Sequence, residues 1–435
     1  MKKGTYLLLT SIALMTLASA TFAANTENDW TAAASATGNI STGSNWSLGH
    51  VPTVSEDATF SPTSSGTGAR HLDNATATFG SLNVSATTGT FTIQNTTNNT
   101  TSTLTLGGAG STGNSVAPNS ADLLYAASGG TLVLKGTNAT AAILNLVLGQ
   151  SGNFDAVGTI NVSSVISDGA NSFGITKTGT GILILSGANT YDGGLTLDAG
   201  ILRFNNAAAA GTGTFTINGG SLTNTSGAAI TASNAVTIGG DFTFIGTSSP
   251  ATSNLTLSGP VTLTGNRAIN VSGTTATLEI SGSIGGAFSL TKNGPGLGTL
   301  ILSGNNTYSG GTNLSSGTLV VASTGNLGTG NVSLTAGNVT LTLQGATNIA
   351  STATLSYVNT DHINLSYSGN MTITGLVVDG VSQGPGVYGA SFSNPDGAFA
   401  GVGTITVVPE PATIGMVALG GSLLMGAMRF RRKLR

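Results

Sequence analysis

The sequence predicts an all-β body built as a parallel β-helix between two targeting ends, and three observations support this fold class. Short runs of Val, Ile, Leu, Thr and Phe alternate with Gly, Asn and Ser pairs along the body, a pattern typical of strands bounded by turns. One motif recurs at a constant spacing of 117 residues. No segment of about 10 to 12 residues between the two ends combines a helical apolar period with helix caps.

Residues 1–23 are predicted to be a secretory signal peptide. Lys2 and Lys3 precede an apolar run over residues 6–17, and the small residues 18–20 supply a cleavage site. A second cleavage point follows at residues 21–23. The exported chain is therefore expected to begin near residue 24.

Composition indicates a folded, exported body rather than a disordered one. The chain has 65 Gly and only 7% charged residues, against about 25% in ordinary soluble domains, yet 39% of its residues are hydrophobic. It has no cysteine, so repetitive burial and backbone hydrogen bonds must hold the exported chain together. Residues 24–408 carry 15 Asp and Glu against six Lys and Arg, a formal charge of −9. This argues against a nucleic-acid partner, because phosphate binding needs a basic patch.

Residues 24–165 are expected to form an N-terminal cap and the first coils of the β-helix. Trp30 and Trp46 are interpreted as a plug that shields the open end of the tube, and Tyr191 and Tyr308 as packed corner residues. The alternative is that these four aromatic side chains form a sugar-stacking platform.

Residues 166–408 are expected to be β-helix with two clear repeat copies, at about 175–204 and 290–321. Residues 185–194 recur as residues 302–311, while a weaker copy at 130–138 lacks the tyrosine and the paired glycines. The shared positions, which we interpret as structural, are Lys177, Gly187, Asn189, Tyr191, Gly193, Gly194 and Gly200 in the first copy, and Lys292, Gly304, Asn306, Tyr308, Gly310, Gly311 and Gly317 in the second.

Each copy reads as strand, turn, short strand, glycine and strand, a unit that cannot bury its apolar face alone. Stacked in parallel at ~4.8 Å, successive units pair every backbone N–H and C=O. Glycine suits the corners because it adopts positive φ without a steric penalty. A β-sandwich would not need this repeat, and a propeller would show blades of ~40 to 50 residues.

The motif resembles the autotransporter-associated β-strand repeat. Its order of lysine, glycines, leucine-rich strand, asparagine, tyrosine and paired glycines fits residues 177–202 and, with Pro295 and Gly296 inserted, residues 292–319. The resemblance implies a right-handed parallel β-helix of the kind found in surface-exposed or secreted proteins.

Residues 409–435 form a three-part tail. Pro409, Glu410 and Pro411 precede the uncharged residues 412–428, which as a helix would span about 25 Å of the ~30 Å hydrocarbon core of a bilayer. The basic end that follows consists of Arg429, Arg431, Arg432, Lys433 and Arg435. The basic residues are expected to stay cytoplasmic, which places the body across the membrane.

This tail resembles the PEP-CTERM sorting signal of Gram-negative bacteria. The resemblance implies recognition by an exosortase-type membrane protease and contact with the membrane through a transmembrane helix at 412–428, at least transiently. It also implies delivery to the cell surface, outer envelope or extracellular matrix, with extracellular polysaccharide as a partner.

Residues for catalysis, a metal or a cofactor are not evident in the sequence. Asp192 and Asp198 lie six residues apart, but the second copy has Ser309 and Ser315 at these positions. The three histidines are far apart in sequence, and metal-binding, phosphate-binding and nucleophile motifs are missing.

The predicted function is therefore an exported, non-enzymatic, structural or adhesive protein. A secreted carbohydrate-active enzyme is the alternative, because parallel β-helices also carry polysaccharide lyases and hydrolases with acids on adjacent coils. A sugar-binding module without catalysis is the third hypothesis.

Overall fold

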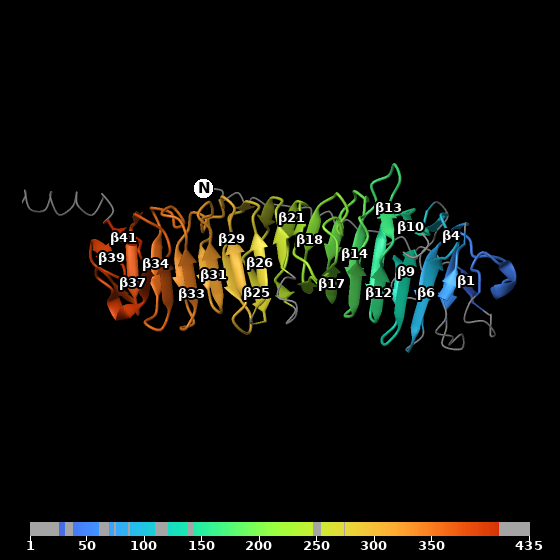
Figure 1. Cartoon of the computed structure of the whole chain (residues 1–435), viewed down its shortest axis with the longest axis horizontal. Coiled ribbons are helices and arrows are strands. Elements are labelled where there is room, and N and C mark those ends of the chain that lie inside the picture. Colours follow the sequence, from blue (N-terminus) through green and yellow to red (C-terminus); the bar gives the residue numbers. More distant parts are fainter. Residues whose placement is uncertain are drawn as a thin grey trace, which may run out of the picture.

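The chain forms one elongated β-solenoid in the computed structural model, and its coils follow one another along the rod in sequence order (Figure 1). The structure describes residues 26–30, 38–60, 69–73, 75–85, 88–108, 121–136, 142–246, 254–273 and 275–408. The predicted all-β, parallel fold is confirmed for these residues. The signal peptide (1–23) and the sorting tail (409–435) lie outside them. The right hand of the coil stays a prediction.

Five sheets hold the described strands, and all neighbouring pairs but two are parallel. The 11-stranded sheet contains β1 (Thr26–Asp29), β2 (Glu56–Phe60), β5 (Ser81–Val84), β8 (Asp122–Ala126), β11 (Gly152–Ala156), β14 (Ile175–Thr178), β16 (Leu195–Leu197), β18 (Phe215–Ile217), β21 (Val236–Ile238), β24 (Val261–Leu263) and β27 (Ile284–Gly285). The 4-stranded sheet contains β4 (Thr76–Phe79), β7 (Thr101–Leu106), β10 (Ile143–Leu148) and β13 (Val165–Ser167).

The 15-stranded sheet runs the length of the rod. It contains β3 (Ala69–His71), β6 (Thr90–Asn95), β9 (Thr131–Gly136), β12 (Thr159–Val162), β15 (Ile182–Leu185), β17 (Ile201–Phe204), β19 (Ser221–Thr223), β22 (Phe242–Ile245), β25 (Arg267–Ser272), β28 (Leu290–Asn293), β30 (Thr312–Leu314), β32 (Val332–Leu334), β34 (Thr354–Tyr357), β37 (Gly375–Val378) and β38 (Val381–Ser382).

Two further sheets complete the second half. The 8-stranded sheet contains β20 (Ile230–Ala232), β23 (Leu255–Leu257), β26 (Thr277–Ile280), β29 (Thr299–Leu302), β31 (Thr318–Val321), β33 (Thr340–Leu343), β35 (His362–Leu365) and β40 (Phe399–Gly401). The 3-stranded sheet contains β36 (Asn370–Ile373), β41 (Thr404–Val407) and β39 (Gly386–Tyr388).

The number of strands per coil changes along the rod. Early coils contribute one strand each to the 11-, 15- and 4-stranded sheets, in that order. The 4-stranded sheet ends at β13, and β14 to β19 then alternate between two sheets until the 8-stranded sheet takes the third position at β20. The 11-stranded sheet ends at β27, and β28 to β35 again alternate between two sheets.

Alternation along each strand builds the core. In β15, Leu183 and Leu185 are completely buried, whereas the two isoleucines between and before them face outward. Parallel pairing stacks Ile160, Leu183 and Leu202 in register on three successive coils. Burying each such side chain contributes about 1.5–3 kcal/mol, so the rod is stabilised coil by coil.

An aromatic cluster fills the N-terminal end of the solenoid. The Trp30 and Trp46 rings meet edge to face at 5.2 Å, and both contact Phe60 at 5.7 Å. Trp46 also donates a hydrogen bond from Nε1 to the Ile40 carbonyl over 3.0 Å. Both tryptophans are at least 97% buried. They are core residues, and the alternative of a sugar-stacking platform is wrong because their faces are not accessible to a ligand.

Helical structure is minimal in the described part of the chain. It contains the two short 3-10 helices η1 (Gly43–Asn45) and η4 (Pro395–Gly397). Within the described ranges, no helix is long and apolar enough to span a bilayer.

Candidate functional site: the repeated corner

The lysine that opens each repeat copy points into the solenoid. Lys177 lies on β14 and Lys292 on β28, and neither exposes any surface to solvent. Lys177 Nζ donates hydrogen bonds to the carbonyls of Thr178, Gly179 (2.7 Å) and Ala199 (3.1 Å). An ammonium group carries three donors, and here each has a backbone acceptor.

The second lysine repeats this arrangement. Lys292 Nζ donates to the Asn293 carbonyl over 3.0 Å and to the Ser316 carbonyl over 2.9 Å. Burial lowers the pKa of both lysines to about 8. For Lys177 the carboxylate of Asp155 on the preceding coil opposes this shift. Each lysine therefore joins its own coil to the next one through carbonyl groups.

The glycine at the far end of each copy leaves room for the ammonium. Gly200 and Gly317 have φ of +73° and +71°, where a side chain is strained. A Cβ on Gly200 would lie 2.7 Å from Lys177 Nζ, and one on Gly317 would lie 3.1 Å from Lys292 Nζ. The lysine and the glycine of the motif are thus parts of one contact.

The asparagine of each copy bridges three successive coils. Asn189 Oδ1 accepts from the Ile166 N–H (2.9 Å), and its Nδ2 donates to the Ala209 carbonyl (2.8 Å). Asn306 makes the same two bonds, with the Ile284 N–H at 2.8 Å and the Asn326 carbonyl at 2.6 Å. Both amides are nearly fully buried. Each asparagine side chain thus bonds to backbone groups of the coils before and after it, where a strand would otherwise supply backbone hydrogen bonds.

These asparagines stand where a sheet ends. Ile166 belongs to β13, the last strand of the 4-stranded sheet, and Ile284 belongs to β27, the last strand of the 11-stranded sheet. In the first copy the Thr190 N–H still donates to the Ile166 carbonyl. In the second copy the N–H groups of Thr307 and Tyr308 donate to the Ile284 carbonyl, and backbone bonds continue through residues 309 and 310. The motif therefore ends one sheet and begins a stretch of two-stranded coils.

The two repeat copies end a sheet on different faces of the rod. In the first copy, Lys177 is on the 11-stranded sheet and the following strand β15 is on the 15-stranded sheet. In the second copy, Lys292 is on the 15-stranded sheet and β29 is on the 8-stranded sheet. The same sequence is thus shifted by one sheet around the axis, which the spacing of 117 residues does not reveal.

The tyrosines pack on glycines of the next coil, which the sequence reading missed. Tyr191 and Tyr308 are fully buried, and burial raises the pKa of both. A Cβ on Gly211 or on Gly328 would lie 3.0 Å from the tyrosine ring of its own copy. These two glycines keep the spacing of 117 residues, so continuing the comparison past residue 321 would have found them.

The paired glycines allow the chain to pass closely over the preceding coil. A Cβ on Gly193 would lie 2.3 Å from the Phe173 carbonyl carbon, and one on Gly310 would lie 2.3 Å from that of Phe288. Gly187 and Gly304 are equally crowded by the carbonyl oxygens of Ser164 and Gly282. The predicted repeat residues of each copy thus lie at two turns of the coil. The lysine and the last glycine meet at the turn before β15 or β29, and the asparagine, the tyrosine and the other glycines lie at the turn after it.

Both repeat copies match one family model. It is described as Passenger-associated-transport-repeat, and it covers residues 175–204 and 290–321. The predicted resemblance to autotransporter-associated repeats is confirmed for these two segments. The lysine, asparagine and tyrosine of each passenger-associated-transport-repeat are buried and bonded within the rod, so they serve its architecture.

A longer similarity exists to a curated protein, the Adhesin BmaC autotransporter of Brucella suis biovar 1 (strain 1330). The two chains are 34% identical over 170 residues, which are 38% of this chain and 4% of that protein. The chain therefore matches only a small part of this relative. No solved structure matches the chain.

Acidic side chains approach a passenger-associated-transport-repeat in one place. Asp122 on β8, Asp155 on β11 and Lys177 on β14 belong to three successive coils of the 11-stranded sheet. The enzyme hypothesis requires acids and a base that converge. Here Asp155 acts on Lys177, whereas Asp122 lies opposite Asn153 and accepts a hydrogen bond from its side chain over 2.9 Å. However, all three residues are at least 97% buried, and the lysine is bonded to carbonyls. A polysaccharide chain has no access to them.

The other acid pair considered from sequence is not a catalytic pair. Asp198 Oδ1 accepts a hydrogen bond from Asn218 Nδ2 on the next coil (2.9 Å). The backbone N–H of Asp192 donates to Asp168 Oδ2 on the preceding coil (3.2 Å). Both contacts hold neighbouring coils together.

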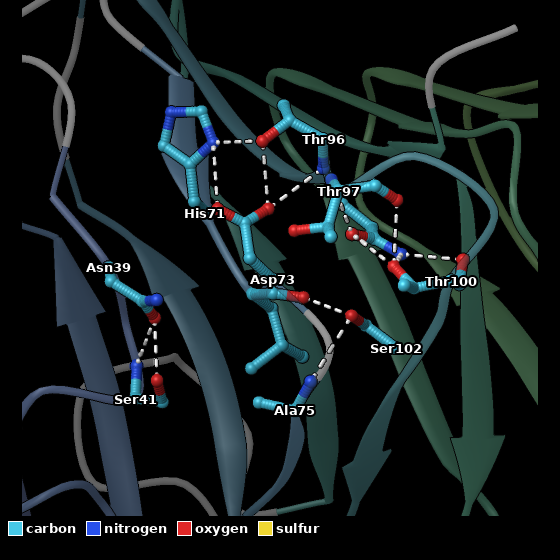
Figure 2. Close-up of polar contacts among 11 residues, drawn as sticks. Asn39, Ser41, His71, Asp73, Ala75, Thr96, Thr97, Thr100 and Ser102 are labelled. Atoms are coloured by element: carbon cyan, nitrogen blue, oxygen red, sulfur yellow. Dashed lines mark hydrogen bonds and ion pairs between the residues drawn. The ribbon is translucent and has the colours of Figure 1, made fainter. Parts of the chain in front are cut away.

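A polar cluster near the N-terminal end also has a structural role. Figure 2 shows His71 Nδ1 at 3.0 Å from Thr96 Oγ1, and the Thr96 hydroxyl donating to Asp73 Oδ1 over 2.8 Å. Asp73 also accepts from the Thr96 N–H, which fixes the turn before β7. Because the hydroxyl proton goes to the aspartate, His71 is not placed as its base, in contrast to a nucleophile–base pair.

The remaining histidines are separate. His50 lies 3.5 Å from Glu56, and His362 is exposed on β35. Within the described residues, no three His, Asp or Glu side chains group so that they could hold a metal ion.

Proposed function

We propose that this chain is an exported, non-enzymatic protein of the bacterial cell surface or extracellular matrix, with a structural or adhesive role. The observation that carries the proposal is that the repeated residues are used inside a continuous rod. Lys177, Asn189 and Tyr191, with their counterparts in the second copy, are buried and bonded to neighbouring coils. This favours a scaffold over a catalytic groove.

The similarity to an autotransporter adhesin over 170 residues supports a surface role. So does the match of both corners to the passenger-associated-transport-repeat, whose name refers to transported passenger segments. The sorting tail at 409–435, with Pro409, Glu410, Pro411 and the basic residues after 428, belongs to this proposal as the route of delivery. An exosortase-type protease is its proposed partner.

The outer face of the rod offers a regular polar surface for adhesion. On the 11-stranded sheet, five threonines stand in register on successive coils, and all of them point outward: Thr176, Thr196, Thr216, Thr237 and Thr262. A second column on the 8-stranded sheet contains Thr277, Thr299, Thr318 and Thr340. Successive hydroxyl and methyl groups are ~4.8 Å apart, the spacing of paired strands.

The test is adhesion of cells that display the chain, measured as retention on a surface coated with extracellular polysaccharide under flow. Thr216→Lys with Thr237→Lys interrupts the first column, and Thr299→Lys with Thr318→Lys is the matched change on the second. Loss of adhesion with one pair and not the other assigns the adhesive face. Unchanged adhesion with both pairs, at equal display, contradicts an adhesive face and leaves the structural role.

The enzyme and sugar-binding hypotheses predict other results. Release of reducing ends or unsaturated sugars from a polysaccharide panel would contradict the non-enzymatic proposal. Binding of a single glycan on an array would favour a sugar-binding module. Mass spectrometry of the mature C-terminus tests the sorting route, because cleavage removes the basic residues and an intact Arg435 would show that the tail is retained.

A further inference from the structure

The C-terminal end of the rod differs from the rest of its surface. Eight large apolar residues are exposed in the described part of the chain, and five of them lie between residues 381 and 408. They are Val381, Val387, Phe392, Val402 and Val408. Phe392 exposes 58% of its surface and Val402 exposes 80%.

These residues lie on the strands that end the sheets or in the segments between and after them. β38 is the last strand of the 15-stranded sheet, β40 of the 8-stranded sheet and β39 of the 3-stranded sheet. Val381 lies on β38, Val387 lies on β39, and Val402 follows β40 directly. Strands β37, β39 and β41 lie at the red end of the rod in Figure 1, so the exposed apolar residues of this segment belong to the axial end of the solenoid.

The two ends of the rod differ in the exposure of their apolar side chains. At the N-terminal end the aromatic side chains are turned inward, and among the residues described there the exposed large apolar side chain is that of Leu48. At the C-terminal end apolar side chains face outward, and residues 375–408 carry only two charged groups, Asp379 and Asp396. An exposed apolar, weakly charged end is a surface that needs a partner.

The segment that follows the last strand indicates which partner lies nearest to this end of the rod. The last described strand, β41, ends at Val407, and the uncharged segment 412–428 begins five residues later. Residues 409–411 reach at most about 11 Å when extended. If 412–428 enters a bilayer, as the proposed sorting tail requires, the lipid surface lies close to Val408, at the same end of the rod as the other exposed apolar residues.

We propose that the end of the rod formed by β38, β39 and β40 rests on the lipid surface while the tail is in the membrane. Val381, Val387, Phe392 and Val402 contact the interfacial region, and the N-terminal aromatic end points away from the bilayer. A 15-stranded sheet at ~4.8 Å per strand then carries that end roughly 70 Å outward. This inference rests on the proposed sorting tail and adds an orientation to it.

The absence of cysteine makes the test direct, because a single introduced cysteine gives a unique spin label. The full chain is reconstituted into vesicles of phosphatidylethanolamine and phosphatidylglycerol. Phe392→Cys and Val402→Cys place labels at the proposed contact. Leu297→Cys and Leu48→Cys are the matched exposed positions along the rod and at the far end, and Ala418→Cys reports the tail itself.

The readout is the accessibility of each label to oxygen, which partitions into lipid, relative to an aqueous nickel chelate. We expect an oxygen-to-nickel ratio at residues 392 and 402 several-fold higher than at 297 and 48. Equal ratios at all four positions, with the label at 418 in lipid, would overturn the inference while leaving the tail proposal intact. Lipid contact at 392 and 402 with 418 in water would support the end surface and reject the membrane tail.

A second copy of the chain is the competing occupant. End-to-end association would shield residues 392 and 402 from both reagents and would add dipolar broadening between labels on two copies. That result would overturn lipid contact in favour of self-association. Far-UV circular dichroism identical to that of the natural chain confirms that the exposed substitutions leave the fold unchanged.

Discussion

Lys177 and Lys292 show how a charged residue becomes part of a solenoid core. Removing an ammonium group from water is expensive, and only carbonyl groups at hydrogen-bond distance make it tolerable. The closed corner supplies these carbonyls from its own turn and from the next coil. The lysine thereby fixes the position of one coil on another, which a leucine in the same place would do with less directional preference.

Stability is expected to rise with pH between about 8 and 10 because of these two residues. Their pKa values in the folded chain are about 8, while an unfolded lysine titrates near 10.4. In this window the unfolded chain holds a proton that the folded chain has released, so the free energy of unfolding increases by up to about 1.4 kcal/mol per pH unit and lysine. Urea titrations at several pH values measure the slope.

Lys177→Met and Lys292→Met should each reduce that slope, although both also lower stability at every pH because carbonyls lose their donor. Lys135→Met is the control, since Lys135 lies partly exposed at the end of β9. A slope that is the same in the natural chain and in both core variants would contradict the burial of the lysines.

Gly200→Ala and Gly317→Ala should destabilise the chain by about 1–3 kcal/mol, since each forces a Cβ into a positive-φ position. The added Cβ would also lie 2.4 Å from the Gly179 and Gly181 carbonyl oxygens at Gly200 and 2.8 Å from the Gly298 carbonyl oxygen at Gly317, with the ammonium group slightly farther away. Two controls separate these causes. Gly89→Ala shares the positive φ but has open space, and Gly384→Ala has open space without it. Chemical denaturation should rank the losses in the order Gly200, Gly89, Gly384.

Among the elements, the asparagine corner has the most specific effect on the architecture. It ends the 4-stranded sheet after β13 and the 11-stranded sheet after β27, and the coil then closes with two strands. A strand at the end of a sheet leaves N–H and C=O groups unpaired, and a buried unpaired group is costly. The asparagine amide supplies a donor and an acceptor in one side chain, so it closes this edge without a further strand.

Asn189→Ala is expected to lower the free energy of unfolding by about 1–3 kcal/mol, because it leaves the buried Ile166 N–H without its acceptor, whereas the Ala209 carbonyl still accepts from the Tyr191 hydroxyl. Amide hydrogen exchange should accelerate at Ile166, whose N–H loses its acceptor. Asn305→Ala is the control. Asn305 is exposed, its one side-chain bond, from Asn326 Nδ2, is also exposed, and the first copy already has Ala188 at this position, so a loss of no more than about 1 kcal/mol is expected. Similar losses for both variants would contradict the role of the corner.

For the whole molecule, the aromatic end is what completes the solenoid. A stack of coils leaves a core layer open at each end, and Trp30, Trp46 and Phe60 fill the first one. The other end is closed by the antiparallel pairs β37–β38 and β39–β41. The two ends of the described rod are therefore closed in different ways.

Trp46→Ala should lower the free energy of unfolding by about 3–5 kcal/mol, the usual loss for removing a buried tryptophan. It should also promote association of rods, because the opened end exposes apolar surface. Leu48→Ala, two residues away and 45% exposed, is the matched control with little effect on either property. Denaturation and light scattering measure the two effects, and an unchanged Trp46 variant would contradict the cap.

Much of the fold was predictable because its information is local and repeated. Short strands such as β15 and β29 carry their own alternation, and glycine marks each corner, so the parallel solenoid followed from period and spacing. The sequence predicted that Asn189 and Tyr191 are structural residues at turns and corners. The partners of Lys177 were not, because they are carbonyls on another coil whose register no single segment specifies.

The sequence by itself determined the fold class, the two copies of the corner and their bounds, since hydrophobic period and glycine spacing are properties of each short segment. The tertiary structure alone decided on which faces the copies stand, which sheets they end, and that the apolar residues after 380 gather at one end of the rod. The physical reason is that coils of two and three strands advance the chain differently around the axis. A spacing of 117 residues therefore gives the separation of the two copies along the chain. Their rotation about the rod axis depends on how many strands the intervening coils contain.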